Sequence, residues 1–181
     1  GTYQVTVSKQ GYGGLPPKEL GVTTSIGFDF ALPPSNNVVQ NWGFESGLSG
    51  WVTSGTVLTQ TFRHSGSWGA TISKTGAVSQ TVAMPAGNVQ SALSFFYRTP
   101  NPSAGDRFEV VVAGSRTASY VFPLSNNTWQ QGWIDTGGFQ GPVEVTFRYA
   151  GAGDLWLDEV SLGGPYWLYL PVVTQSYSLG W

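Results

Sequence analysis

Hydrophobic and polar residues alternate along most of the chain, which is the pattern of β-strands that bury one face. In SALSFFYR, residues 91–98, Leu93, Phe95 and Tyr97 fall on one face of the predicted strand. PVEVTFRY, residues 142–149, has apolar residues at every second position as well. Spacing of the helical kind, at i, i+3, i+4 and i+7, is broken throughout by Gly, Pro or β-branched residues. We therefore predict an all-β protein.

Turn clusters such as TPNPSAGD and AGAGD separate the predicted strands, and this spacing is typical of an antiparallel β-sandwich or jelly roll. A seam at ALPPSNN precedes residues 38–163, which hold enough predicted strands for one sandwich. Residues 1–34 hold too few strands to enclose a core, so we interpret them as an incomplete domain or a donor segment. Residues 164–181 are interpreted as a C-terminal strand and tail.

The composition narrows the class of protein. Of 181 residues, 40% are hydrophobic and only 10% charged, and the net charge of −2 comes with no basic cluster, so we expect no nucleic-acid partner. The apolar runs are too short to span a bilayer, and the lack of Cys excludes a disulfide framework. A surface of Thr, Ser, Asn and Gln predicts a secreted or cell-surface bacterial protein. Because the chain starts without Met, we expect it to be a piece of a longer one.

Two motifs lie near the ends of the predicted sandwich: NWGFESGLSGW at residues 41–51 and LWLDEVSL at residues 155–162. With HSGSWGATISKTGAVSQTV and SALSFFYRT between them, they resemble the jelly-roll carbohydrate-binding modules. That family begins with an N-G-x-F-E-like strand and ends with an aromatic-x-D-x-V-x-L strand. The resemblance covers roughly residues 38–163. It implies a non-catalytic module that binds a glycan or cell-wall polysaccharide.

The resemblance also implies a structural Ca²⁺. In that family the Glu of the first motif and the Asp of the last strand commonly share the ion with backbone carbonyls, which here assigns Glu45 and Asp158. The turn at Ser65 is a possible source of carbonyls, and Ca²⁺ takes six to eight oxygen ligands. The alternative is that both carboxylates are solvated or cap local amides. Trp51, which follows the Gly50 turn, is predicted to pack into the core.

Glycan binding requires exposed flat aromatic rings, on which the apolar face of a pyranose stacks, with amides or guanidinium groups reading its hydroxyls. The candidate stacking rings are Trp42, Trp68, Tyr97, Trp133, Tyr149 and Trp156, and the candidate polar partners are Arg98, Arg148, Gln130 and Gln131. The alternative for each aromatic is a place in the core, which is the commoner position for such residues in a β-sandwich.

Catalysis has little support in the sequence. His64 is the single histidine and lies in a Gly-flanked turn, and no G-x-S-x-G motif is present. One His without Cys supplies no zinc ligand set. The acidic residues are scattered, apart from Asp154, Asp158 and Glu159 on the strand where calcium is expected. We therefore predict that the protein is not an enzyme.

The flanking segments support an alternative function. GTYQVTVSKQGY, at the N-terminus, resembles the closing strands of a carboxypeptidase-regulatory-like or prealbumin-like surface domain. An unpaired apolar strand is usually covered, either within its own chain or by a neighbouring copy. The alternative is therefore a structural subunit of an extracellular filament or surface assembly. Its copies would be joined by β-strand exchange through residues 1–31 and 166–174.

Overall fold

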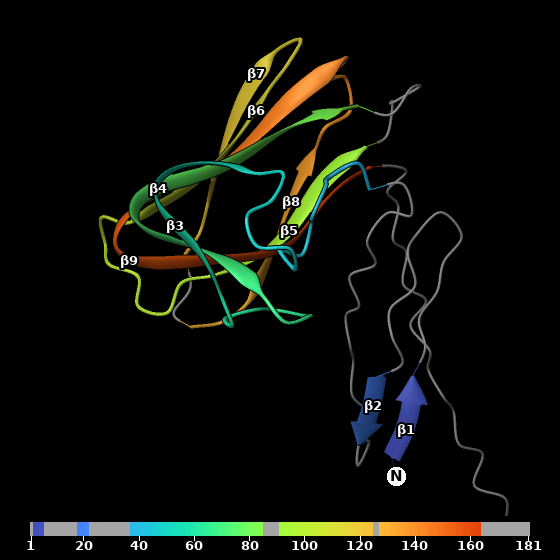
Figure 1. Ribbon diagram of the computed structural model, residues 1–181, viewed down its shortest axis with the longest axis vertical. Helices are drawn as coiled ribbons and strands as arrows, with labels where there is room; N and C mark the ends of the chain where they lie inside the picture. The colour runs from blue at the N-terminus through green and yellow to red at the C-terminus, as the bar shows by residue number, and fades with distance from the viewer. Residues whose placement is uncertain (1, 6–17, 22–36, 85–90, 125–126, 164–181) are drawn as a thin grey trace, which may run out of the picture.

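A computed structural model of the chain describes residues 2–5, 18–21, 37–84, 91–124 and 127–163 (Figure 1). Every regular element within these ranges is a β-strand, which confirms the predicted all-β class. The strands are β1 (Thr2–Val5), β2 (Lys18–Gly21), β3 (Val52–Gln60), β4 (Gly69–Ala83), β5 (Ala92–Arg98), β6 (Arg107–Ala113), β7 (Thr117–Phe122), β8 (Gln130–Asp135) and β9 (Pro142–Gly163). No described segment forms a helix capable of crossing a membrane.

The strands form two separate sheets, and all pairs are antiparallel. β1 pairs with β2 of the same chain, with Thr2 opposite Gly21 and Val5 opposite Lys18. The larger sheet has the order β3-β4-β9-β5-β8, and β6 joins it by pairing with β9, with β7 on its other edge. The predicted strand at residues 166–174 lies outside the described residues.

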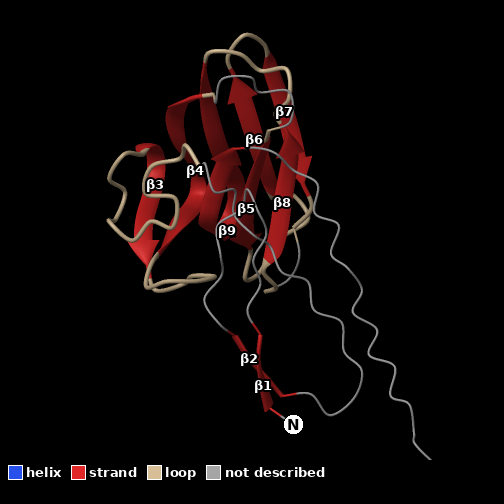
Figure 2. Cartoon of the chain, turned by 90° about the vertical axis from the view of Figure 1, so that its right-hand side faces the viewer, coloured by secondary structure: helices blue, strands red, loops and turns tan. Residues whose placement is uncertain are grey.

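The larger sheet folds over itself because β4 and β9 are long and bent. Residues 142–150 of β9 pair with residues 75–83 of β4, and residues 144–150 pair with β6 on the other side. Beyond the bend, residues 154–163 of β9 pair with the start of β4 and with β5. We call the part with β6 and β7 the first layer and the part with β5 and β8 the second layer. Figures 1 and 2 show the two groups of strands on either side of the bend. This is the predicted β-sandwich.

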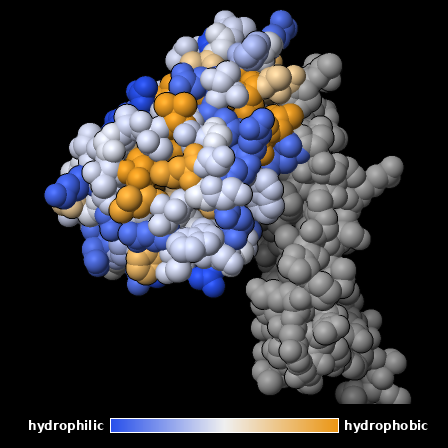
Figure 3. Space-filling model, viewed as in Figure 1, coloured by the Kyte–Doolittle hydropathy of each residue, from blue (hydrophilic) through white to orange (hydrophobic). Residues whose placement is uncertain are grey.

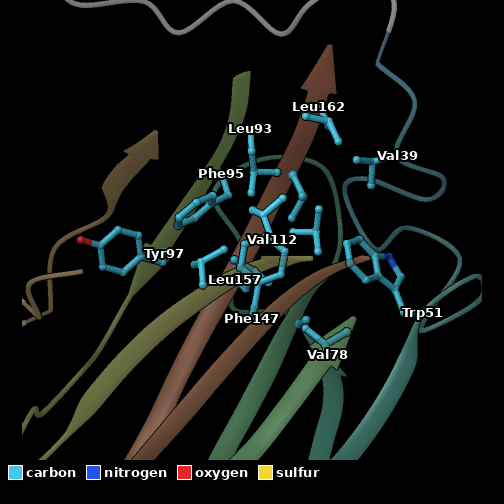
Figure 4. Packing of buried hydrophobic residues seen from close by; sticks show 14 of the residues in the cluster. Val39, Trp51, Val78, Leu93, Phe95, Tyr97, Val112, Phe147, Leu157 and Leu162 are labelled. Atoms are coloured by element: carbon cyan, nitrogen blue, oxygen red, sulfur yellow. The ribbon is translucent and has the colours of Figure 1, made fainter. Parts of the chain in front are cut away.

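The core lies between the two layers and is largely aromatic. Leu93, Phe95 and Tyr97 of β5 are buried, as their alternation predicts, and they meet Phe147 of β9 (Figure 4). The centroids of Phe95 and Phe147 are 5.0 Å apart in an edge-to-face arrangement. Trp51 is also buried, as predicted. This core fixes which side chains of each strand point outward, and so it determines the surface available for binding.

Candidate functional site

The outer face of the second layer carries a band of aromatic and polar side chains. It consists of the residues that alternate with the core residues on β5, β8 and β9. Their cross-strand pairs are Ser94 with Trp133, Phe96 with Gln131 and Arg98 with Trp156. The hydroxyls of Ser94 and Ser161 lie 3.2 Å apart on the same face. Three strands therefore present these side chains side by side.

Four aromatic rings are exposed among the described residues, and Trp133 is the one that lies on an outer strand position of this layer. Of the described Phe, Trp and Tyr residues, Trp42, Phe62, Trp68 and Trp133 are exposed, by 42% to 52%. Trp133 lies on β8, Trp42 is joined to β9 through its carbonyl, which accepts the Val160 N–H at 2.9 Å, and Trp68 immediately precedes β4.

The outer face of the first layer is different. Its outward positions on β4, β6, β7 and the start of β9 are small, aliphatic, hydroxyl-bearing or charged, with no aromatic ring at any described position. Figure 3 shows one side of the molecule, on which apolar side chains form small groups between polar ones. At the outward strand positions that the structure describes, the exposed aromatic ring is therefore on the second layer, at Trp133, and none is on the first.

A loop formed by residues 61–68, the 61–68 loop, covers part of the aromatic band. Phe62 lies parallel to Trp156, with centroids 4.3 Å apart and planes at 10°. His64 lies on Phe96 in the same way, with centroids 3.8 Å apart. Trp156 is only 8% exposed as a result. The loop thus divides the band into a covered part, Trp156 of β9 and Phe96 of β5, and an open part, the exposed Gln131 and Trp133 of β8.

The guanidinium group of Arg98 borders the covered part. Its central carbon lies 4.9 Å from the centroid of the Trp156 ring, an arrangement that favours a cation–π contact. The Arg98 Nε donates to the side-chain oxygen of Asn127 at 3.0 Å. Arg98 is therefore held in place at the edge of the indole.

Two carboxylates hold the 61–68 loop through its backbone. The buried Asp158 accepts the His64 and Ser65 N–H groups on Oδ2, at 2.8 and 3.0 Å. Glu45 accepts the Ser67 N–H at 2.8 Å and the Trp68 N–H at 3.1 Å. We call these contacts the carboxylate clasp. The clasp matches the alternative in which the two carboxylates cap local amides.

Gly66 lies at the centre of the carboxylate clasp. Its φ of +66° is in the left-handed region, and a Cβ on it would lie 2.2 Å from Oε1 of Glu45. The loop can therefore approach Glu45 only because this residue is glycine.

One property of the carboxylate clasp favours Ca²⁺, namely the burial of the Asp158 carboxylate. Burial raises the pKa of Asp158 to about 6, although N–H groups of Ser65, His64 and Glu159 act against that rise. When hydrogen bonds do not fully offset the cost of burying a carboxylate charge, a nearby cation stabilises that charge. Further ligands would have to come from backbone oxygens, because the described residues contain no group of three or more His, Cys, Asp or Glu side chains suited to a metal.

The structure separates the predicted ligand-binding residues into three groups. Trp42, Trp68 and Trp133 are exposed as expected. For Tyr97 the expectation is wrong, because its ring is in the core, where its hydroxyl donates to the Pro123 carbonyl at 2.8 Å and burial raises its pKa to about 12. Tyr149 is buried as well and donates to Asp106.

The remaining candidates are dispersed. Trp156 is on the expected strand but under Phe62, so the expected exposed ring is wrong for this conformation. Arg98 and Gln131 lie on the outer face of the second layer, whereas Arg148 lies on the first layer, opposite Glu109. Gln130 pairs with Tyr97 on the inner side. Sequence reasoning missed Phe62, because its contact is with a ring 94 positions away and belongs to no local pattern.

No protein-family model and no curated protein matches the sequence. A carbohydrate-binding module of family 61, in complex with β-1,4-galactotriose, matches in fold with a TM-score of 0.60, 23% identity, and coverage of 71% of this chain and 98% of that one. A family 16 carbohydrate-binding module has a TM-score of 0.55 and 21% identity, covering 70% of this chain and 99% of the other.

A family 22 module of Clostridium thermocellum, from the C-terminal part of a longer protein, has a TM-score of 0.51 and 12% identity. This match covers 72% of this chain and 94% of that one. At such identities the likeness concerns the fold. These three structural neighbours are carbohydrate-binding modules with a β-sandwich fold, as the two terminal motifs led us to expect.

Proposed function

We propose that this chain is a non-catalytic glycan-binding module whose binding surface is the outer face of the second layer. The observation that carries the proposal is the exposed indole of Trp133 on that face, beside further aromatic and polar side chains of β5 and β9. A pyranose presents apolar C–H faces that stack on such rings, while hydroxyls require hydrogen-bonding side chains beside them. The aromatic band supplies both, and the first layer supplies no ring among its described outward positions.

Trp133 is the main stacking residue in this proposal. It is the most exposed of the described rings, at 52%, and it lies on the open part of the band. Gln131, two residues earlier on β8, points to the same side and is exposed, so its amide can bond to hydroxyls of the same sugar. Ser94 lies directly opposite Trp133 on β5. Trp133 and Gln131 therefore offer an exposed ring with an amide beside it, and the buried Ser94 lies beneath them.

The fold supports this interpretation. The family 61 neighbour is described in complex with β-1,4-galactotriose, and the matches cover nearly all of each neighbouring module. A polysaccharide ligand also suits a secreted or cell-surface bacterial protein, which is the location that the composition predicts. We propose a neutral glycan or cell-wall polysaccharide as the ligand class, because Trp133 and Gln131 carry no charge.

The test is binding of the full chain to a panel of soluble polysaccharides, by affinity electrophoresis followed by calorimetry on any that bind. We expect Trp133→Ala to weaken binding at least tenfold, which equals about 1.4 kcal/mol. The matched control is Val121→Ala, because Val121 is 55% exposed on the first layer. Equal affinity in the Trp133→Ala and wild-type proteins, or no binding to any polysaccharide, would overturn the proposal.

We also propose a structural Ca²⁺ held by Glu45 and Asp158. The uncompensated charge of the buried Asp158 supports it, and the ion would tie the 61–68 loop to β9. The test compares the Tm in EDTA with the Tm in millimolar CaCl₂, for the wild type and for Glu45→Gln. We expect Ca²⁺ to raise the wild-type Tm and to act less on the variant. If Ca²⁺ changes neither Tm while Glu45→Gln lowers it, the amide contacts alone hold the loop.

The outer edge of β7, which has no partner strand among the described residues, favours a second candidate function, assembly by strand exchange. TASYVF, residues 117–122, pairs with β6 on one side and contains no charged residue, whereas exposed edges usually carry charges that prevent association. A donor strand from residues 1–31 or 166–174 of another copy would add to that edge. Light scattering with negative-stain microscopy should then show concentration-dependent oligomers that Val121→Lys abolishes. A monomer at all concentrations would exclude this function for the chain.

A further inference from the structure

Two buried polar atoms under the 61–68 loop lack hydrogen-bond partners. They are Oγ1 of Thr71 and Nε1 of Trp156. Thr71 is fully buried and Trp156 is 8% exposed. The two residues are directly opposite each other on β4 and β9. Since buried polar atoms are nearly always paired, two orphans at one place favour a partner from outside the chain, either an ordered water or a hydroxyl of a ligand.

Both atoms belong to the outer face of the second layer rather than to the core. Thr71 lies between the core residues Ala70 and Ile72, so its side chain points outward. Its neighbour on the other side is Leu58 of β3, which is 50% exposed. The two orphan atoms therefore belong to the outer side of the layer, where Phe62 lies over the Trp156 ring.

The ring that lies over Trp156 is not a core residue. Phe62 comes from the 61–68 loop and is itself 47% exposed, yet it lies parallel to the indole at a centroid distance of 4.3 Å. A pyranose ring stacks on tryptophan in the same parallel manner. Phe62 therefore occupies the position that a sugar ring would take, but a benzene ring offers no hydrogen bond to either orphan atom.

We propose that Trp156 is the floor of a second, covered sugar subsite, which Phe62 fills until a pyranose displaces it. This inference rests on the proposed glycan-binding function. A sugar hydroxyl would accept from Trp156 Nε1 and a hydroxyl would pair with Thr71 Oγ1, so binding satisfies both orphans. Arg98, held at 3.0 Å from the Asn127 oxygen, would lie at the rim of this subsite.

The position of the subsite predicts the form of the ligand. Arg98 lies on β5 between Trp156 of β9 and the end of β8, and Trp133 lies on β8 on the same outer face. A chain that reached both Trp133 and Trp156 would cross β5. The ligand is thus an oligosaccharide rather than a single sugar, and longer oligomers of the recognised glycan gain more from the subsite.

The first test removes the competing ring. We expect Phe62→Ala to bind oligosaccharides three- to tenfold more tightly than the wild type, with no gain for the monosaccharide. Phe62→Ala combined with Thr71→Val should lose that gain, because valine keeps the shape and lacks the hydroxyl. Leu58→Ala is the control, since it shortens an exposed side chain opposite Thr71 and leaves the stack intact. An unchanged or weaker affinity of Phe62→Ala for every oligomer length would contradict the proposal.

The second test does not depend on affinity. The chain has eight Trp residues, whose indole N–H signals can be resolved by NMR, and Trp156→Phe assigns the signal of Trp156. We expect that signal to move on addition of the oligosaccharide that binds best. If it stays fixed while the Trp133 signal moves, glycan binding stands and the subsite does not exist, which leaves an ordered water as the partner of the orphans. If no glycan moves any signal, the proposed function fails as well.

Discussion

Gly132→Ala would measure how tightly the aromatic core is packed. Gly132 of β8 lies opposite Phe95 of β5, and an added Cβ would lie 2.2 Å from two atoms of the Phe95 ring. The end of an exposed ring could swing aside at little cost, but this ring is enclosed. The centroids of Phe108, Phe122 and Phe147 lie 5.0 to 5.8 Å from that of Phe95. Phe95 therefore cannot move unless its neighbours move too.

Two effects of opposite sign set the magnitude. Glycine weakens a strand interior, so alanine would ordinarily stabilise by about 0.5–1 kcal/mol. Overpacking a core costs about 1–3 kcal/mol, and a contact of 2.2 Å belongs in the upper half of that range. We therefore expect a net loss of about 1–2.5 kcal/mol in the free energy of unfolding. A loss of stability in Gly132→Ala would indicate that close packing dominates, and a gain would indicate that backbone propensity dominates.

The assay is urea unfolding followed by tryptophan fluorescence. Gly105→Ala is the matched control, because a Cβ at Gly105 meets no atom within 4 Å. We expect the control to be neutral or slightly stabilising and Gly132→Ala to unfold at lower urea. Phe95→Leu should reduce the effect of Gly132→Ala, since the two changes act on one contact. A midpoint for Gly132→Ala at or above that of the wild type would refute the reasoning.

Three further predictions concern the loops and the buried phenol. Gly66→Ala should lower the Tm and, in hydrogen exchange, expose the amides that donate to Glu45, because its Cβ would occupy the position of that carboxylate. Tyr97 has a folded-state pKa of about 12, above the usual 10, so its contribution to stability is complete below pH 10 and is lost as the pH rises through 12. Tyr97→Phe should therefore lose less stability between pH 9 and pH 11.5 in urea unfolding. Hydrogen bonds from Ser103 and Tyr149 lower the pKa of Asp106, so Asp106 contributes stability above pH 3.8 that is lost as the pH falls further. Asp106→Asn should flatten this acid limb of the urea midpoint.

The alternation of apolar and polar residues correctly predicted which side chains share a face of a strand. It did not predict equally well whether that face lies in the core or on a binding surface. Alternation places Tyr97 on one face with Leu93 and Phe95, and the structure shows that this face is the core, so Tyr97 cannot be a stacking ring. Arg148 points outward as the pattern predicts. Its layer could not be predicted, because that depends on where β9 bends between its two halves.

The covered part of the band could not be predicted from the sequence. It depends on the 61–68 loop, which has no periodicity and is held by carboxylates far away in the chain. Glu45 and Asp158 were recognised as a pair through the family resemblance, and the structure brings both to the same loop. Their hydrogen bonds to the N–H groups of residues 64, 65, 67 and 68 join positions far apart in the chain, so no local sequence pattern indicates them.

The strands β4 and β9 run through both layers without interruption, and this has a consequence for how the domain opens. Because each layer contains half of the same two strands, neither layer can detach while the other keeps its register. The amides of β4 and β9 should then exchange with solvent only when the whole sandwich unfolds. Formation of the β4–β9 ladder joins residues about 60 to 90 positions apart, which makes folding slow for the size of the domain. A pulling force applied to the outer face by a bound polysaccharide would therefore act on both layers together and could not separate them one at a time.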